Sequence, residues 1–298
     1  MCDDIDPGTR EGFILVSKAP PKSEPRRIEL ADFLRTRREA IRPQDVGLPG
    51  GGRRRTPGLR REEVAQLAGV GTTWYTWLEQ GRDVRASGSV LKGIAEALEL
   101  TPAERAHLML LGRGEQVAPQ RAPIEELEPT IRRLVEHLGQ SPACITGRRF
   151  DFLAWNEAHA AVFGNPGEMP DGRRNLLWSV FMDPARRKLH ADWNQGARRL
   201  VARFRSQAAK YVGDPDFESL IEALREGSPE FAEWWELHEV ATSGVGRKTI
   251  RHPTAGKLVF EHAVFLAQEN VDQRLVAYSP VDVADTPTKL RKLLAERS

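Results

Sequence analysis

The segment Thr56–Gly81 reads TPGLRREEVAQLAGVGTTWYTWLEQG and constrains the fold more than any other part of the chain. Apolar residues recur with helical spacing from about residue 59 to 68. Gly69 follows where that helix has to end, because a residue without Cβ tolerates left-handed dihedral angles. A second helix then runs to Gln80 and ends at another glycine. This spacing predicts a helix-turn-helix whose second helix enters a DNA groove.

The second helix of this motif has two faces. Tyr75 and Leu78 are three residues apart, which predicts that both point into the protein core. Threonines and a tryptophan remain on the outward face, where small hydroxylated side chains approach base edges closely. For the tryptophan, packing against a neighbouring helix or a dimer partner is the alternative. The predicted base contacts are Thr72, Thr73, Thr76 and Trp77.

Positive charge is concentrated just before and inside the motif. Residues 26–61 contain eleven arginines and four acidic residues, a balance of +7 in a chain whose net charge is +2. A basic segment beside a groove-binding motif is typical of phosphate contact, although a solvated arginine face or a flexible linker is the alternative. The predicted contacts to the DNA backbone are Arg53, Arg54, Arg55, Arg60, Arg61 and Arg82.

Composition excludes several other classes of protein. The 298 residues favour two domains, and no apolar run approaches the length of a membrane span. The two cysteines exclude a disulfide framework and a four-cysteine zinc site, and they fit a reducing cytoplasm. We expect the protein to be cytoplasmic and associated with the nucleoid. No nucleophile elbow, phosphate loop, zinc-protease or dinucleotide motif is present, so we predict neither an enzyme, a metal site nor a required cofactor.

Periodicity divides the chain into an all-α domain and an α+β domain. The first contains five short helices, and the second combines one antiparallel sheet with a helical layer. One long helix is expected from about residue 185 to 211, and strands are expected at about 143–146, 150–155, 248–251, 258–267 and 273–279. The predicted boundaries are a disordered extension at 1–26, the helix-turn-helix domain at 27–113, a linker at 114–123, the second domain at 124–285 and a tail at 286–298.

Aromatic residues are dense in the second domain. Each of them alone is typical of a hydrophobic core. Together they favour an apolar pocket between the sheet and the helices, with one cation at its mouth for an acidic lipid. Arg205 and His252 are the candidate cations, and otherwise each is an ordinary surface or sheet-edge residue. The predicted aromatic ligand contacts are Phe152, Trp155, Phe181, Trp193, Phe204 and Trp235.

The chain resembles a known family of regulators across about residues 28–280. The first domain is similar to XRE-type helix-turn-helix domains, and RRRTPGLRREEVAQLAGV followed by WYTWLEQGR resembles the MmyB-like transcription regulators. The second domain carries further motifs that resemble this family: GRRFDFLAWN, RNLLWSVFMDP, ADWN, RFR, SPEFAEWW and RHP. At Gly71 the family usually has serine, so Thr72 or Thr73 has to cap the recognition helix.

The resemblance implies a PAS-like second domain that binds a small apolar ligand, with long-chain fatty acids as one occupant. It also implies homodimers on pseudo-palindromic sites in double-stranded DNA. We therefore expect a dimeric, sequence-specific transcription regulator. The alternative is a DNA-binding protein whose second domain is only a dimerisation or partner-binding platform with a filled core.

Overall fold

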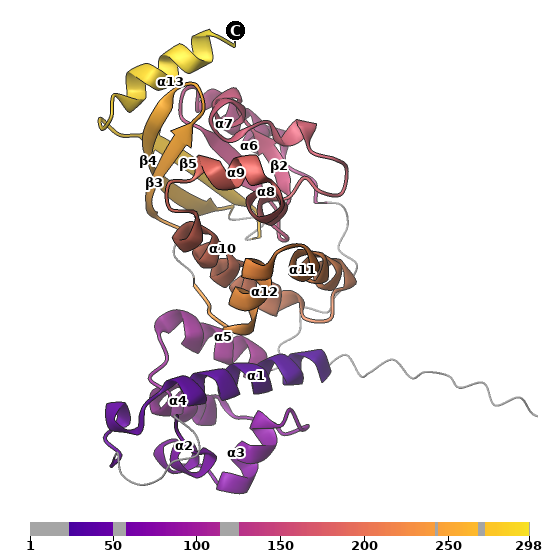
Figure 1. Cartoon of the computed structure of the whole chain (residues 1–298). Coiled ribbons are helices and arrows are strands. Elements are labelled where there is room, and N and C mark those ends of the chain that lie inside the picture. Colours follow the sequence, from indigo (N-terminus) through magenta and orange to yellow (C-terminus); the bar gives the residue numbers. More distant parts are fainter. Residues whose placement is uncertain (1–23, 50–57, 114–124, 242–243, 268–271, 298) are drawn as a thin grey trace, which may run out of the picture.

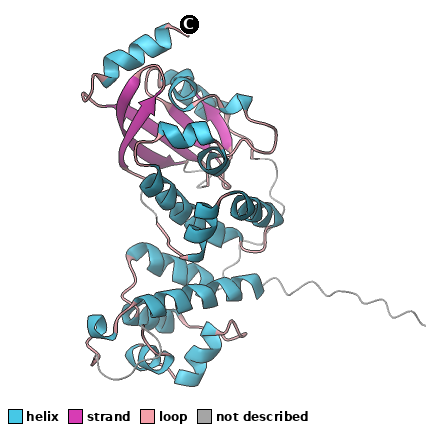
Figure 2. Cartoon of the chain, in the orientation of Figure 1, coloured by secondary structure: helices cyan, strands magenta, loops and turns pink. Residues whose placement is uncertain are grey.

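The computed structural model describes residues 24–49, 58–113, 125–241, 244–267 and 272–297. The described chain forms two domains stacked end to end, helical at one end and containing a sheet at the other (Figures 1 and 2). In this described part, none of the helices combines the length and the apolar character needed to cross a bilayer. The predicted order, an all-α domain followed by an α+β domain, is confirmed.

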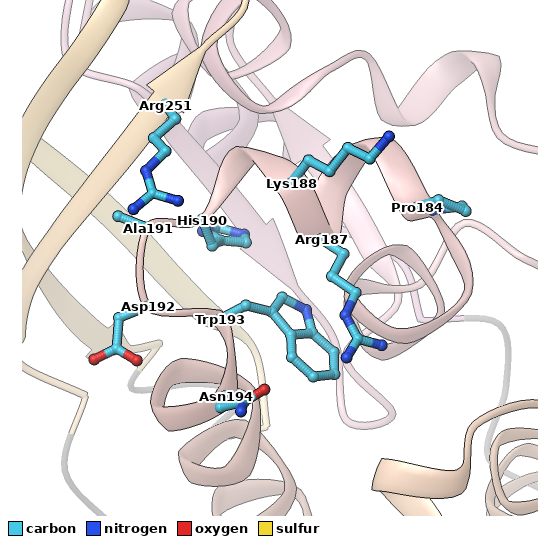
Figure 3. A pocket seen from close by; sticks show the side chains of 9 residues that line it. All are labelled: Pro184, Arg187, Lys188, His190, Ala191, Asp192, Trp193, Asn194 and Arg251. Carbon is cyan, nitrogen blue, oxygen red and sulfur yellow. The ribbon is translucent and has the colours of Figure 1, made fainter.

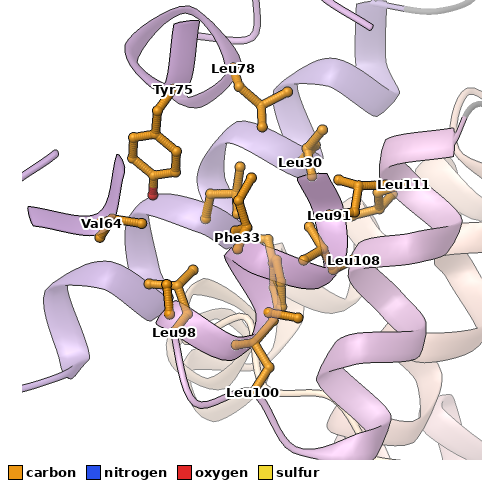
Figure 4. Packing of buried hydrophobic residues seen from close by; sticks show 14 of the residues in the cluster. Leu30, Phe33, Val64, Tyr75, Leu78, Leu91, Leu98, Leu100, Leu108 and Leu111 are labelled. Atoms are coloured by element: carbon orange, nitrogen blue, oxygen red, sulfur yellow. The ribbon is translucent and has the colours of Figure 1, made fainter. Parts of the chain in front are cut away.

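Five helices and one 3₁₀ turn make up the described residues of the N-terminal domain. Its core lies where α1, α3, α4 and α5 meet, and Tyr75 and Leu78 point into it as predicted (Figure 4). The capping box that opens α5 links Thr101 and Glu104, whose backbone amides donate to each other's side chains at 2.9 and 3.3 Å. The elements are α1 (Glu24–Ala40), η1 (Pro43–Val46), α2 (Arg61–Leu67), α3 (Thr72–Glu79), α4 (Gly88–Ala97) and α5 (Pro102–Arg113).

The C-terminal domain contains a five-stranded antiparallel sheet in the order β2-β1-β5-β4-β3. The strands are β1 (Ala143–Thr146), β2 (Phe152–Trp155), β3 (Gly246–His252), β4 (Gly256–Leu266) and β5 (Arg274–Pro280). The helices and 3₁₀ turns are α6 (Pro129–His137), α7 (Glu157–Phe163), η2 (Pro166–Glu168), α8 (Leu176–Met182), α9 (Pro184–Leu189), α10 (Trp193–Ala208), η3 (Ala209–Tyr211), α11 (Pro215–Gly227), α12 (Pro229–Glu236) and α13 (Thr286–Ala295).

Helices cover the sheet in two places and also separate it from the N-terminal domain. Helix α6 packs on the β1–β2 side, and residues of α7, α9 and α13 share a core with the opposite face of the sheet. A second core joins α8, α10, α11 and α12, which lie between the sheet and the N-terminal domain (Figure 1). The tertiary arrangement therefore places a helical layer between the sheet and the helix-turn-helix.

Three predicted boundaries differ from the structure. Helix α1 begins at Glu24, inside the stretch predicted as disordered, and the predicted tail contains α13, whose Leu290 and Leu293 are buried. The single helix expected at 185–211 is two helices, because the segment between α9 and α10 pairs with the edge strand. In that segment, the amide of Ala191 donates to the carbonyl of Thr249 at 3.1 Å. The linker predicted at 114–123 lies outside the described residues.

Candidate functional site

The turn between α2 and α3 depends on a left-handed glycine. Helix α2 is opened by Glu63, whose carboxylate accepts the backbone N–H of Arg60 at 2.7 Å. Gly69 has a φ of +68°, a conformation that a residue with Cβ adopts only with strain. The amide of Val70 then donates to the carbonyl of Ala65 at 2.9 Å, which closes the turn. This geometry holds α3 at a fixed angle to α2, as in a helix-turn-helix.

Helix α3 presents its predicted base-contact residues away from the core. Thr72 and Thr73 are exposed, Thr76 is half-buried, and Trp77 is 40% exposed. The guanidinium of Arg82 lies 5.8 Å from the ring centroid of Trp77, which is within cation–π range. Helix α3 lies at the end of the molecule farthest from the sheet (Figure 1). The structure thus brings these four residues onto one outward face, and their contact with DNA remains a prediction.

A buried carboxylate fixes the inner side of α3. Glu79 is fully buried and accepts hydrogen bonds from Arg38 Nε at 2.7 Å, from an Arg38 terminal nitrogen at 2.8 Å and from Arg61 Nε at 2.9 Å. Burial alone would raise the pKa of Glu79, but the two arginines together lower it below its ordinary value. Arg38 also donates to the carbonyl of Leu59, so one side chain ties α1 to α3 and to the segment just before α2.

The predicted backbone contacts occupy different environments. Arg60 and Arg82 are exposed on either side of the motif, where α2 begins and after α3 ends. Arg61 is half-buried, and its Nε is engaged by Glu79, so only the rest of its guanidinium is available to a phosphate. Arg53, Arg54 and Arg55 lie outside the described residues.

The predicted ligand contacts do not converge on one pocket. Phe181, Trp193, Phe204 and Trp235 belong to the helical core. Phe152 and Trp155 pack instead in the core against the sheet. The aromatic residues that suggested a single pocket are therefore divided between two cores. The periodicity of the sequence does not reveal this division.

Two of the predicted contacts do meet at a pocket between the domains. Arg205 and Trp235 line a cavity of about 250 Å³ together with Glu29, which comes from α1. Arg205 donates to the carboxylate of Glu29 and to the carbonyl of Trp235, and its guanidinium stacks 3.9 Å from the centroid of the Trp235 ring. His238 Nδ1 lies 3.1 Å from the same guanidinium. Arg205 is therefore an interdomain contact as well as a pocket residue.

The interdomain contact continues around this ion pair. The pKa of Glu29 is lowered to about 2, because His238 and Arg205 together outweigh the effect of burial. Arg37 of α1 donates to the carbonyl of Leu237 at 2.7 Å and to Glu104 at 2.8 Å. The N-terminal core also includes Ala209 from the C-terminal domain. Polar and apolar contacts together join the two domains.

Two predicted ligand contacts, His252 and Trp193, lie away from the interdomain pocket. His252 accepts the backbone N–H of Ala255 at 3.1 Å in the β3–β4 turn, and its other ring nitrogen lies 3.1 Å from the carbonyl of Ala161. This histidine organises the hairpin and does not line any of the described pockets. Trp193 borders an open surface groove of about 520 Å³ with Arg187, His190 and Arg251 (Figure 3). Arg187 stacks on Trp193 at 4.0 Å from its ring centroid.

Sequence reasoning missed two cations that lie close together beside the sheet. Lys248 of β3 and Arg203 of α10 share an environment with Tyr278 and His262. Their positions in the sequence carry no signal, because a lysine in an edge strand and an arginine on a basic helix are ordinary on a protein surface. Only the packing of α10 beside the sheet brings them together.

Comparison with known families agrees with this architecture. A family model described as the ligand-binding domain of MmyB-like transcription regulators matches residues 127–293, and one described as a helix-turn-helix domain matches residues 29–108. No curated protein matches the chain. The first match spans more than half of the chain and includes most of α13, and the second includes α2 and α3. The protein therefore belongs to the MmyB-like transcription regulators, as a helix-turn-helix DNA-binding domain joined to a ligand-binding domain.

Proposed function

We propose that this regulator binds a pseudo-palindromic operator as a homodimer and that a small apolar ligand, such as a fatty acid, modulates its affinity for DNA. The observation that carries the DNA-reading part is the outward face of α3, where Thr72, Thr73 and Trp77 are exposed next to the exposed Arg82. Threonine methyl groups contact thymine methyls, and the hydroxyls bond to base edges or phosphates. In a dimer, two such helices read half-sites about one DNA turn apart.

A chain of direct contacts connects the ligand-binding domain to α3. The interdomain pocket is lined by Arg205, which is paired with Glu29 on α1. Helix α1 in turn holds α3 through the pair of Arg38 with Glu79. A ligand shifts the arrangement of the two recognition helices only if it has different affinities for two arrangements. Helix α1 is the element through which we expect such a shift to travel.

Substitution of the exposed threonines tests the DNA-reading part. We expect Thr72→Ala and Thr73→Ala each to lower affinity for the operator by about 1–3 kcal/mol per lost base contact, with non-specific affinity unchanged. Gel-shift titrations on the operator and on a scrambled duplex measure both quantities. Thr130→Ala, at an exposed threonine of α6, is the matched control. Unchanged preference for the operator in both α3 variants would contradict the proposal.

Titration with ligand tests the sensing part separately. Native mass spectrometry of the purified protein identifies any small molecule that remains bound, and lipid extraction removes it. We expect extracted and reloaded protein to differ in operator affinity by the coupling factor of the ligand, typically about 5- to 150-fold. Equal affinity in the two states would leave a DNA-binding protein without sensing.

The second candidate is a C-terminal domain that serves only for dimerisation or partner binding. It is favoured by Val245, Phe265 and Leu266, which are 75%, 58% and 59% exposed at one end of the β3–β4 hairpin. Exposed apolar residues in a group are typical of interaction surfaces. The two candidates differ in their response to ligand. The platform is supported if the purified protein retains no ligand, if added ligand leaves DNA affinity unchanged, and if the Phe265→Ser variant is monomeric.

A further inference from the structure

The first turn of α1 lies against the segment that follows the recognition helix. Gly81 has a φ of +69°, and a Cβ added there would lie only 3.3 Å from the carbonyl oxygen of Arg27. Arg27 Nε donates to the carbonyl of Gly81 at 3.1 Å. A terminal nitrogen of Arg27 also lies 3.6 Å from the carboxylate of Asp83. One arginine of α1 therefore contacts two residues of the segment after α3.

The backbone of Arg82 is held on both sides within this segment. Its N–H donates to the carbonyl of Trp77 at 3.0 Å, and the N–H of Gly81 donates to the carbonyl of Leu78 at 3.1 Å. These two bonds form the Schellman motif that ends many helices. On the other side, the carbonyl of Arg82 accepts the N–H of Val84 at 2.8 Å, and Val84 packs against the N-terminal core. The path of the chain after α3 is therefore fixed.

The side chain of Arg82 extends from this anchored backbone beside the outward face of α3. It is exposed, and its guanidinium lies over the ring of Trp77. A long side chain loses conformational entropy when it is fixed on a phosphate. Anchoring the backbone in advance lowers this loss, because fewer torsion angles remain to be ordered on binding. The contacts of Arg27 with the neighbouring residues contribute to this anchoring.

The pair of Arg27 with Asp83 has a second consequence for the neighbouring arginine. Asp83 directly follows Arg82 in the chain, and its side chain is 85% exposed. A carboxylate at this place repels a phosphate and competes with it for Arg82. Arg27 offsets the charge of Asp83, although only 20% of the Arg27 side chain is exposed. Because such an ion pair contributes little to stability, we expect its loss to affect DNA binding more than folding.

We infer that Arg27 is a positioning residue for DNA binding, which holds Gly81 and Asp83 so that Arg82 contacts a phosphate of the DNA backbone. This assignment rests on the proposed function, in which α3 reads DNA and Arg82 lies beside it. It adds a residue of α1 that lies outside residues 29–108, the region that the helix-turn-helix family model matches. Arg27 acts through Arg82 and makes no phosphate contact of its own.

A double-mutant cycle tests the assignment. The full chain selects a duplex from a random-sequence library, and gel shifts measure its affinity for that duplex over a series of salt concentrations. We expect Arg82→Met to lower affinity about tenfold, the effect of one charge-assisted bond, and to reduce the slope of log affinity against log salt by about 0.9. Arg27→Met should lower affinity at least about threefold and reduce the slope as well, because the phosphate contact is partly lost. In the Arg82→Met background, the same substitution should have no further effect.

A matched control and a local measurement complete the test. Arg35→Met removes the same charge from an exposed position of α1, and its effect is expected to be equal in the two backgrounds. Amide hydrogen exchange shows where Arg27→Met acts. We expect faster exchange at Arg82 and Val84, whereas the interior amides of α3 should keep the wild-type rate, because Glu79 still holds that helix.

The outcomes separate this assignment from the proposed function. An equal loss of affinity from Arg27→Met in both backgrounds would show that Arg27 contacts DNA directly, and would overturn the assignment. Faster exchange throughout α3 would also overturn it, since Arg27 would then only stabilise that helix. An unchanged salt slope in Arg82→Met would remove the phosphate contact on which the assignment depends, while the threonine substitutions in α3 still test base reading. If the wild type selects no duplex, the proposed function itself is wrong.

Discussion

Loss of the Glu79 carboxylate tests how the recognition helix is held. Glu79→Gln removes the negative charge and leaves the side chain of Arg38, which is 6% exposed, without its main counterion. Breaking a buried ion pair on one side costs about 3–5 kcal/mol. Glu39 still lies 3.1 Å from Arg38, which compensates in part, and Arg61 is too exposed to contribute much. We therefore expect a loss near the lower limit, about 3 kcal/mol.

Amide hydrogen exchange in the full chain measures this loss locally. A loss of about 3 kcal/mol in the free energy of opening corresponds to exchange of the α3 amides roughly 100-fold faster. Amides of α11, on the far side of the helical layer, are expected to exchange at the wild-type rate. Glu62→Gln, at an exposed position of α2, is the control. Acceleration of less than about fivefold, or an equal effect of the control, would refute the view that this pair anchors α3.

Three further predictions follow from the charged groups. Arg60→Gln is expected to reduce the slope of log affinity against log salt by about 0.9 if Arg60 contacts one phosphate, and a gel-shift series over salt concentration measures the slope. Because the pKa of Glu79 is lowered, its stabilising effect is complete above its ordinary value of 4.5 and is lost as pH falls through the folded-state pKa. On acidification, the free energy of opening of α3, measured by exchange relative to the intrinsic rate, should therefore fall more in the wild type than in the Gln variant. Glu29→Gln leaves Arg205 buried at the interface without its carboxylate partner, and X-ray scattering should detect a larger radius of gyration, whereas an unchanged radius would show that apolar contacts alone hold the domains.

Local sequence determined the elements and the type of motif. Gly69 had to adopt a left-handed conformation, and the apolar spacing of Tyr75 and Leu78 left the threonine face outward, as the structure has it. The capping box of Thr101 and Glu104 and the alternation in the strands are equally local signals, because each depends on residues a few positions apart. Such local signals have the same effect in any tertiary structure in which the helix or strand forms.

Tertiary packing decided the features that depend on distant residues. The helix expected at 185–211 is interrupted because the edge strand β3 offers backbone partners to residues 190 and 191. Arg205, a candidate for holding an acidic ligand, is paired with Glu29, which lies 176 positions away. The aromatic residues that suggested one pocket were divided between two cores.

The cations beside the sheet show the same limit most clearly. Lys248 and Arg203 are unremarkable in the sequence, and they share an aromatic environment only because α10 packs beside the sheet. Local patterns therefore determined which face of α3 points outward, since a helix face is set by spacing of three and four residues. Burial and charge balance are properties of all neighbours in space, so only the folded chain decided which charged side chains lie together and how the two domains are joined.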